Sequence, residues 1–305
     1  MKDFKGRVAI ITGAASGFGK EFVKEAAKRG MKIVAVDIMG DKLAEIESVA
    51  KENGAEAVTL ITADVGIYEE TEKVVNTTLE KYGQIDLLIN NAGVAVAGNG
   101  LSLPLRDWEW IIQTNLMSHV YLMRQVIPVM MKQGTHCNIM NTCSAAGFMN
   151  WFGMAPYYTT KHAALSLSES INYELQAAKA DIAMTVFCPG YVQTSLDHSD
   201  EYRPERFRDD SDPYYQSEEF KKGIEEFHRV IENGYPLEGH GEMVFKAIEE
   251  DQFYVIPHEK YDDFLKLQTS EKLQRKSPNL AEVVAAIKAK KEAAAAAAAA
   301  AQQNQ

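Results

Sequence analysis

The chain has 305 residues, and 46% of them are hydrophobic, enough to bury one large core or two modest ones. It carries 32 basic and 43 acidic residues, and the net charge of −11 disfavours nucleic acid and anionic membrane surfaces as partners. No apolar run is as long as a membrane span, and residues 1–6 lack the apolar core of a signal peptide.

Cysteine and histidine patterns argue against a disulfide framework and a metal site. The three cysteines, Cys137, Cys143 and Cys188, lack Cys-x-x-Cys spacing, which suits a reducing cytoplasm. The seven histidines are scattered and contain no His-Glu-x-x-His pair. We therefore expect a cytoplasmic protein in which the histidines are surface or capping residues and bind no metal.

The first predicted elements are a strand, a glycine-rich turn and a helix. Residues 7–12 form a short β-branched run typical of a buried parallel strand, and residues 20–29 have amphipathic helical spacing. The glycines from Gly13 to Gly19 would let backbone approach a phosphate at the helix N-terminus. Their spacing is Gly-x-x-x-Gly-x-Gly, so an ordinary strand–helix turn remains the alternative.

The next predicted strand, residues 32–37, ends in an acidic residue. Asp37 follows Gly19 by eighteen positions, close to the ~20 expected of a carboxylate that binds the adenosine ribose of a dinucleotide. Such a carboxylate would repel a 2′-phosphate, and neither Ile38 nor residues 14–16 supply an arginine. The pattern favours NAD(H) over NADP(H), although Asp37 could instead end its strand or cap the next helix.

Strands and helices continue to alternate along the chain. Further strands are predicted at 57–63, 85–89, 137–142, 182–187 and 252–257, and helices at 68–82 and 105–132. This order predicts an α/β fold with a doubly wound parallel sheet of about seven strands and helices on both faces. Ligands of such sheets lie outside the carboxyl ends of the strands. The residues that follow these ends are Gly13, Asp37, Asp64, Asn91, Ser144 and Pro189.

A hydroxyl, a phenol and an amine follow one another between Ser144 and Lys161. Pro156 suits the first turn of a helix, which would place Tyr157 and Lys161 at i and i+4 on one face. A phenol normally titrates near pH ~10, and lowering its pKa by about three units requires about 4 kcal/mol of differential interaction. A nearby ammonium favours the phenolate, so Tyr157 could exchange a proton with an alcohol or a ketone.

Taken in order, these motifs resemble those of the short-chain dehydrogenase/reductase family. The resemblance covers residues 5 to roughly 195. Phe18 and Cys143 are slight departures from the usual pattern. The motifs that carry it are Thr12–Gly19, Asn90–Gly93, Asn115, Ser144, Tyr157 with Lys161, and Pro189–Gly190. The resemblance implies a Rossmann-type fold and an enzyme that moves a hydride between a nicotinamide and a substrate carbon.

The resemblance also implies the roles of the site residues. Tyr157 would be the general acid/base, Ser144 would bind the same substrate oxygen, and Lys161 would bind the nicotinamide ribose and lower the pKa of Tyr157. Asn115 would bend its helix and anchor a water of a proton relay. The implied cofactor-binding residues are Gly13, Ser16, Gly17, Phe18, Gly19, Asp37, Asp64, Val65, Asn91, Ala92, Gly93, Tyr157, Lys161, Pro189, Gly190, Val192 and Thr194.

Apolar side chains crowd the loop between Ser144 and Tyr157, which borders the substrate in this family. They favour a bulky apolar, aromatic or steroid-like substrate, with packing of the loop onto the core as the alternative. The predicted substrate residues are Phe148, Trp151, Phe152 and Met154.

The segments after the core motifs predict a lid and an extension. We expect a catalytic domain over 1–258 with a substrate lid at 196–239, whose helix spans 218–231. Residues 259–305 would form a C-terminal extension with a helix-forming stretch that ends in the alanine run Ala293–Ala301. The extension resembles that of longer bacterial NAD-dependent secondary-alcohol dehydrogenases.

The sequence therefore predicts an NAD(H)-dependent oxidoreductase that interconverts a secondary alcohol and a ketone. An NADP(H)-preferring carbonyl reductase and a non-catalytic NAD-binding regulatory protein remain alternatives. The resemblance also implies a homodimer or homotetramer formed through helices at 105–132 and 155–178.

Overall fold

The computed structural model describes residues 1–285, 288–289 and 292 of the chain. The chain divides into two compact units, Met1–Pro257 and His258–Gln305. The alanine run Ala293–Ala301, predicted to be helical, lies outside the described residues.

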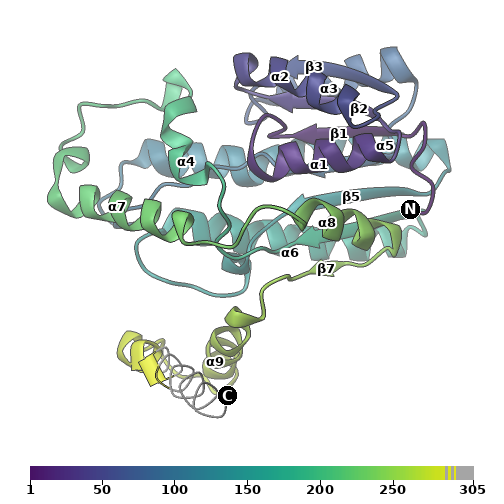
Figure 1. The fold of residues 1–305 in the computed structure, drawn as a ribbon. Coiled ribbons are helices and arrows are strands. Elements are labelled where there is room, and N and C mark those ends of the chain that lie inside the picture. Colours follow the sequence, from purple (N-terminus) through teal and green to yellow (C-terminus); the bar gives the residue numbers. More distant parts are fainter. Residues whose placement is uncertain (286–287, 290–291, 293–305) are drawn as a thin grey trace, which may run out of the picture. The chain divides into compact units, whose positions relative to one another are not determined.

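The first unit is built on a seven-stranded parallel sheet in the order β3-β2-β1-β4-β5-β6-β7 (Figure 1). This confirms the predicted fold. The order reverses between β1 and β4, the point at which doubly wound sheets bind ligands. The strands are β1 (Val8–Thr12), β2 (Lys32–Asp37), β3 (Ala57–Thr62), β4 (Leu87–Asn90), β5 (Cys137–Thr142), β6 (Ile182–Phe187) and β7 (Tyr254–Val255).

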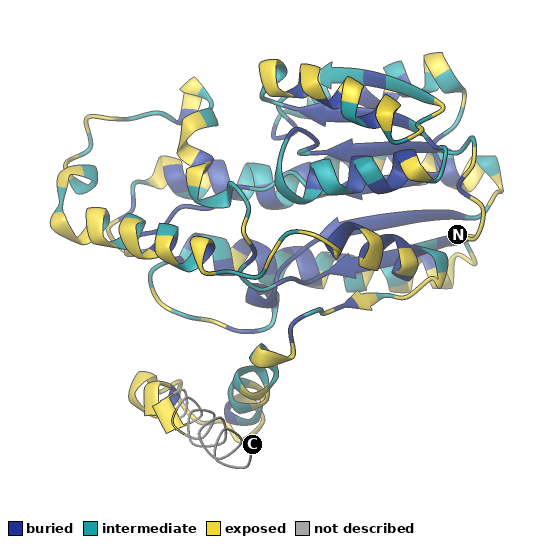
Figure 2. Cartoon of the chain, viewed as in Figure 1, coloured by how far each residue is buried: buried dark blue, intermediate teal, exposed yellow. Residues whose placement is uncertain are grey.

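Helices cover both faces of the sheet, and the strands between them are buried (Figure 2). Side chains alternate along each strand, so Ile11 packs with Phe22 on one face while its neighbour Ile10 packs with Val74 on the other. The first face is covered by α1 (Gly17–Lys28), α2 (Gly40–Glu52) and α8 (His240–Glu249). The second is covered by α3 (Tyr68–Tyr82), α5 (Ser118–Gln133) and α6 (Ala155–Ala177), with α4 (Leu105–Ile112) packed on α6.

The helical stretch predicted at 105–132 is interrupted at Asn115, the residue that the family resemblance implied would bend it. A π-helical turn, Gln113–Met117, separates α4 from α5. Asn115 lies in this turn, and its side chain donates to the Val94 carbonyl at 2.9 Å and accepts from the Val94 N–H at 2.8 Å. The π-helical turn therefore lies at Asn115, whose side-chain amide pairs with both the N–H and the carbonyl of Val94.

The segment between β6 and α8 consists of short turns and one long helix. The turns are Leu196–Tyr202, Glu205–Phe207 and Pro213–Gln216, and the helix is α7 (Glu218–Glu232). Ser217 caps α7, because its hydroxyl accepts from the Phe220 N–H at 3.1 Å. The amphipathic spacing of 218–231 thus corresponds to a real helix, within the part of the chain predicted to be a lid.

The second unit contains α9 (Asp262–Leu273), and residues 280–285 are also helical. Across the described part of the chain, no helix combines the length and the apolar character that crossing a bilayer would require.

Candidate active site

The glycine-rich turn after β1 leaves no room for side chains at two positions. A Cβ on Gly19 would lie 1.8 Å from the Gly13 carbonyl oxygen, and one on Gly13 would lie 2.9 Å from the Ala92 Cα. Gly17 has a φ of +48° and faces Thr194, whose Cβ lies 3.4 Å from the place of a Cβ. The turn therefore presents bare backbone at the N-terminus of α1, the arrangement that suits a phosphate.

The segment after β4 is tied to this turn. The Thr12 hydroxyl accepts from the N–H groups of Asn91 and Ala92 at 2.9 and 3.0 Å, and the Asn91 amide donates to the Thr12 carbonyl at 3.0 Å. Farther along, a Cβ on Gly93 would lie 3.7 Å from the Lys161 Nζ. Residues 91–93 thus connect the glycine-rich turn to the predicted catalytic residues.

Asp37 lies buried at the end of β2, beside the glycine-rich turn. One carboxylate oxygen accepts from the Ala15 N–H and the other from the Met39 N–H, both at 2.9 Å. Burial raises the pKa of this carboxyl, although the backbone donors act in the opposite direction. Each carboxylate oxygen can accept more than one hydrogen bond, so the group can also bind a ribose hydroxyl.

Asp64 and Val65, two of the residues implied to bind the cofactor, occupy different environments. Val65 is buried in the core on the α3 side of the sheet. Asp64 forms an ion pair with Arg206, with 2.5 Å between Oδ2 and Nη1, and accepts from the Gly66 N–H at 2.9 Å. Arg206 belongs to the segment between β6 and α7, so that segment reaches the carboxyl end of β3.

The structure brings the four predicted catalytic residues together. Lys161 is buried, its Nζ donates to the Thr142 carbonyl at 3.0 Å, and it lies 5.6 Å from the centre of the Tyr157 ring. A hydrogen bond joins Ser144 to Tyr157, and the Ser144 hydroxyl also donates to the Pro189 carbonyl at 3.3 Å. Asn115 lies against α6, with its Nδ2 3.3 Å from the Thr160 hydroxyl.

The electrostatics of Tyr157 differ from the expectation that Lys161 lowers its pKa. Burial raises the pKa of the phenol well above its usual value, and only the hydrogen bond with Ser144 opposes this. Burial also lowers the pKa of the Lys161 ammonium. Burial thus shifts both pKa values toward the neutral form, and the Lys161 ammonium donates to the Thr142 carbonyl.

Two of the four predicted substrate residues lie beside Tyr157. Trp151 and Met154 belong to the same apolar cluster as the Tyr157 ring. Phe148 packs in another cluster with Cys143 and Cys188, and Phe152 is 64% exposed, with its ring 4.8 Å from that of Trp151. The loop therefore divides its apolar side chains between the core and the Tyr157 side.

The other predicted residues lie close to these groups. Ser16 is the residue before α1, and Phe18 packs edge-on against Phe187, with 5.0 Å between ring centres. Val192 is buried and pairs with Tyr235 in an isolated bridge, and Gly190 follows Pro189 at the carboxyl end of β6.

The sequence predicted the α7 helix as part of a lid, but not which of its side chains join the cluster that contains Tyr157. Ile224, Phe227 and Ile231 from this helix join the cluster that contains Tyr157 and Trp151. Their i, i+3, i+7 spacing was the available signal, but it indicates only that the face is buried and not what it contacts.

Sequence reasoning also missed a buried ion pair between α4 and the segment before α7. Arg203 donates to Asp107, and its guanidinium lies 4.4 Å from the Trp110 ring centre. Asp107 also accepts from the Tyr215 hydroxyl at 2.9 Å. No spacing rule joins residues that are 96 and 108 positions apart in the chain.

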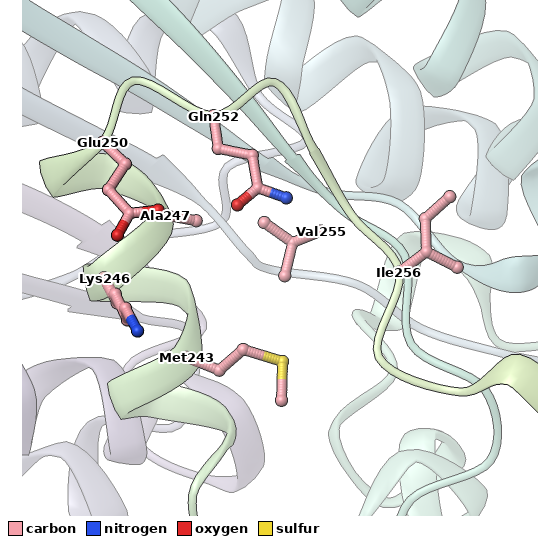
Figure 3. A pocket seen from close by; sticks show the side chains of 7 residues that line it. All are labelled: Met243, Lys246, Ala247, Glu250, Gln252, Val255 and Ile256. Atoms are coloured by element: carbon pink, nitrogen blue, oxygen red, sulfur yellow. The ribbon is translucent and has the colours of Figure 1, made fainter.

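A separate pocket of about 280 Å³ lies between α8 and the β7 region (Figure 3). Its walls are the side chains of Met243, Lys246, Ala247, Glu250, Gln252, Val255 and Ile256. None of the predicted site residues lines it, so we do not assign the reaction to this pocket.

The residues at the carboxyl ends of the strands fit a nicotinamide dinucleotide. The glycine-rich turn is packed so closely that a Cβ on Gly13 or Gly19 would clash with backbone, and Asp37 keeps acceptor capacity next to it. The family model described as short chain dehydrogenase matches residues 7–204. The chain belongs to the short-chain dehydrogenase/reductase family.

Two similar proteins match most of this family member. It is 46% identical over 265 residues to the "CLA biosynthesis dehydrogenase/reductase" of Lactiplantibacillus plantarum, which covers 87% of this chain and 92% of that protein. A short-chain dehydrogenase/reductase from Burkholderia phymatum, solved in complex with NAD, superposes with a TM-score of 0.88 at 30% identity, over 92% of this chain and 98% of the other.

A third relative is named for a different activity. The 3-ketoacyl-(acyl-carrier-protein) reductase of Brucella melitensis, solved with NADH, has a TM-score of 0.66 at 26% identity over 83% of this chain and 98% of its own. The chain is therefore an oxidoreductase of this family, and the NAD-bound neighbour supports a nicotinamide cofactor.

Proposed function

We propose that this enzyme interconverts a secondary alcohol and a ketone on a bulky apolar substrate, with NAD(H) as the hydride carrier. The observation that carries the proposal is the group formed by buried Ser144, partly buried Tyr157 and buried Lys161, whose phenol ring packs against an apolar cluster. Of the four predicted catalytic residues, Ser144 follows the carboxyl end of β5, Tyr157 and Lys161 are on α6, and Asn115 is in the π-helical turn.

The proton is handled by residues of this chain. In ketone reduction, the Tyr157 phenol donates its proton to the substrate oxygen while the Ser144 hydroxyl holds that oxygen in place. Because burial raises the pKa of Tyr157, the phenol is protonated at neutral pH and ready for this direction. Oxidation of the alcohol requires the phenolate, whose population grows as the pH rises. The nicotinamide supplies or accepts the hydride.

The supporting residues hold this group in place. Lys161 would bind the nicotinamide ribose, and its bond to the Thr142 carbonyl fixes the side chain in the buried position. The Asn115 side chain keeps the π-helical turn against residue 94, next to the segment that carries Gly93. These contacts hold the donors still before the substrate arrives, which is how a site gains from orientation.

Preference for NAD(H) rests on Asp37. Its carboxylate is buried at the end of β2, and a carboxylate that binds the adenosine ribose there would repel a 2′-phosphate. Ile38 supplies no compensating cation.

The apolar cluster supports a bulky apolar substrate. Trp151 and Met154 of the loop and Ile224, Phe227 and Ile231 of α7 are all side chains without charge, arranged around the catalytic ring. The Lactiplantibacillus plantarum relative is named as a dehydrogenase/reductase, which agrees with the proposed class of reaction.

The test is NADH formation, followed by absorbance, across secondary alcohols that range from short aliphatic to aryl and steroid, with NADP in parallel. We expect turnover with NAD and one bulky class, and loss of turnover in Tyr157→Phe while NAD still binds. Preference for NADP would favour the carbonyl reductase alternative. Full activity in Tyr157→Phe would refute the mechanism, and NAD binding without turnover of any substrate would favour a regulatory protein.

A further inference from the structure

A cluster of possible metal ligands lies outside the catalytic group. Asp197 and His198 are in the turn Leu196–Tyr202, and His228 is on α7. One donor atom from each of the three residues lies within 4.8 Å of the other two. The histidines are thirty positions apart, so the sequence expectation of surface histidines and no metal could not anticipate this meeting.

The donor atoms are arranged around the Asp197 carboxylate. Its Oδ2 lies 2.7 Å from His228 Nδ1 and 3.6 Å from His198 Nε2, and the two imidazole centres are 5.0 Å apart. Ligands of a tetrahedral ion with bonds of about 2.1 Å are about 3.4 Å apart. The His198 distance already fits, and the His228 distance needs to lengthen by less than about 1 Å to fit the same geometry.

A second carboxylate orients His198. Glu201 Oε1 lies 3.0 Å from His198 Nδ1, so a proton on Nδ1 leaves Nε2 with a lone pair toward Asp197. Metal-bound histidines commonly have a carboxylate partner of this kind on the other ring nitrogen.

The burial of Asp197 points to a missing cation. Its side chain is only 5% exposed, and within the described part of the chain Oδ1 is buried with no hydrogen-bond partner. A buried carboxylate with an unpartnered oxygen is unfavourable, and a cation bound to its Oδ2 among these three residues would offset the buried charge. The His198 and His228 side chains are 51% and 35% exposed, which leaves a route of entry from solvent.

We propose that Asp197, His198 and His228 form a binding site for a divalent transition-metal ion of the zinc class. Two imidazoles and one carboxylate match the donors that Zn²⁺ accepts, with water in the fourth position. Mg²⁺ and Ca²⁺ are disfavoured, since they prefer sets made of oxygen ligands only.

The site joins two elements that border the substrate side of Tyr157. Leu196, next to Asp197, and Phe227, next to His228, both belong to the apolar cluster around Tyr157. A bound ion would therefore cross-link the turn after β6 to α7 and hold both walls of that cluster at a fixed separation. The site is peripheral to the proton-transfer group, and its binding test does not require turnover.

The experiment measures metal binding to the full chain after chelator treatment and dialysis. Calorimetry with Zn²⁺ should give one ion per chain, and Co²⁺ should give the visible absorption bands of a tetrahedral site. His198→Ala and His228→Ala should each weaken Zn²⁺ binding at least tenfold and abolish the cobalt bands. The matched control is His136→Ala, because His136 is a partly exposed histidine paired with Asp181 and Asp251.

Further variants separate this site from folding defects and from the thiols. Circular dichroism establishes that each variant is folded, and Asp197→Asn keeps the side-chain shape while removing the charge, so it too should lose binding. The three cysteines are buried, and Zn²⁺ bound to them would persist in the histidine variants. Absence of stoichiometric binding to the wild type would refute the proposal, as would binding unchanged in His198→Ala and His228→Ala.

Discussion

Replacing Arg203 with Met should release the segment between β6 and α7 from the rest of the first unit. Arg203 and Asp107 have 6% and 0% of their side chains exposed, so the ion pair is almost fully removed from water. In Arg203→Met, Asp107 keeps only its hydrogen bond from Tyr215. The buried Asp107 carboxylate then has no cation partner. Opening of the segment lets water reach this carboxylate and therefore becomes more favourable.

The expected magnitude follows from this burial. Removing one partner of a buried pair costs about 3–5 kcal/mol, which corresponds to a rise in the open population of about a hundredfold to several thousandfold. Part of the effect is lost stacking of the guanidinium on Trp110, worth about 1–2 kcal/mol when desolvated. Exposed pairs contribute only about 0–1 kcal/mol, so Arg208→Met, which breaks a 3.8 Å pair with Glu205, is the matched control.

The assay is limited proteolysis with chymotrypsin, which does not cleave at arginine and so treats both variants alike. Cleavage follows the equilibrium population of the open form when closing is faster than cutting. We expect cleavage within 202–215 to accelerate at least a hundredfold in Arg203→Met and less than about fivefold in Arg208→Met. Asp107→Leu combined with Arg203→Met should restore part of the protection, since no charge then stays buried. Equal rates in Arg203→Met and the wild type would refute the reasoning.

Three further predictions concern the cofactor and the proton. Gly19→Ala places a Cβ 1.8 Å from the Gly13 carbonyl oxygen, so NAD binding measured by calorimetry should weaken at least tenfold; unchanged affinity would contradict the close approach. Asp37→Ala with Ile38→Arg should shift the ratio of kcat/KM for NADP and NAD toward NADP, and an unchanged ratio would show that the ribose is bound elsewhere. Because burial raises the pKa of Tyr157, kcat/KM for alcohol oxidation should climb with pH beyond neutrality, about tenfold per unit at most. A plateau below pH 7 would contradict that direction.

Much of the fold was predictable because its signals are local. The strands predicted at 32–37 and 137–142 have those bounds in the structure, and Pro156 marks the first turn of α6. The motif order also identified the family, since the glycines and polar residues at strand ends are fixed by the backbone they must contact.

The boundaries of regular patterns were less predictable where side chains replace backbone partners. Residues 105–132 were expected to form one helix, and their apolar spacing contains no mark of the π-helical turn at Gln113–Met117. The turn is associated with the contact between Asn115 and residue 94, which the chain makes only when folded. The strand expected at 252–257 is reduced to Tyr254–Val255, because only these residues pair with β6.

By itself, the sequence determined the parallel sheet, the glycine-rich turn and the residue types at the strand ends, because these depend on neighbours within one element. Only the tertiary structure decided which residues from distant elements meet: Arg203 with Asp107, His228 with Asp197, and the α7 side chains with Tyr157. It also decided the direction of the Tyr157 pKa. The i, i+4 spacing placed Lys161 within reach of Tyr157, but the burial that raises the pKa of the phenol exists only in the folded chain.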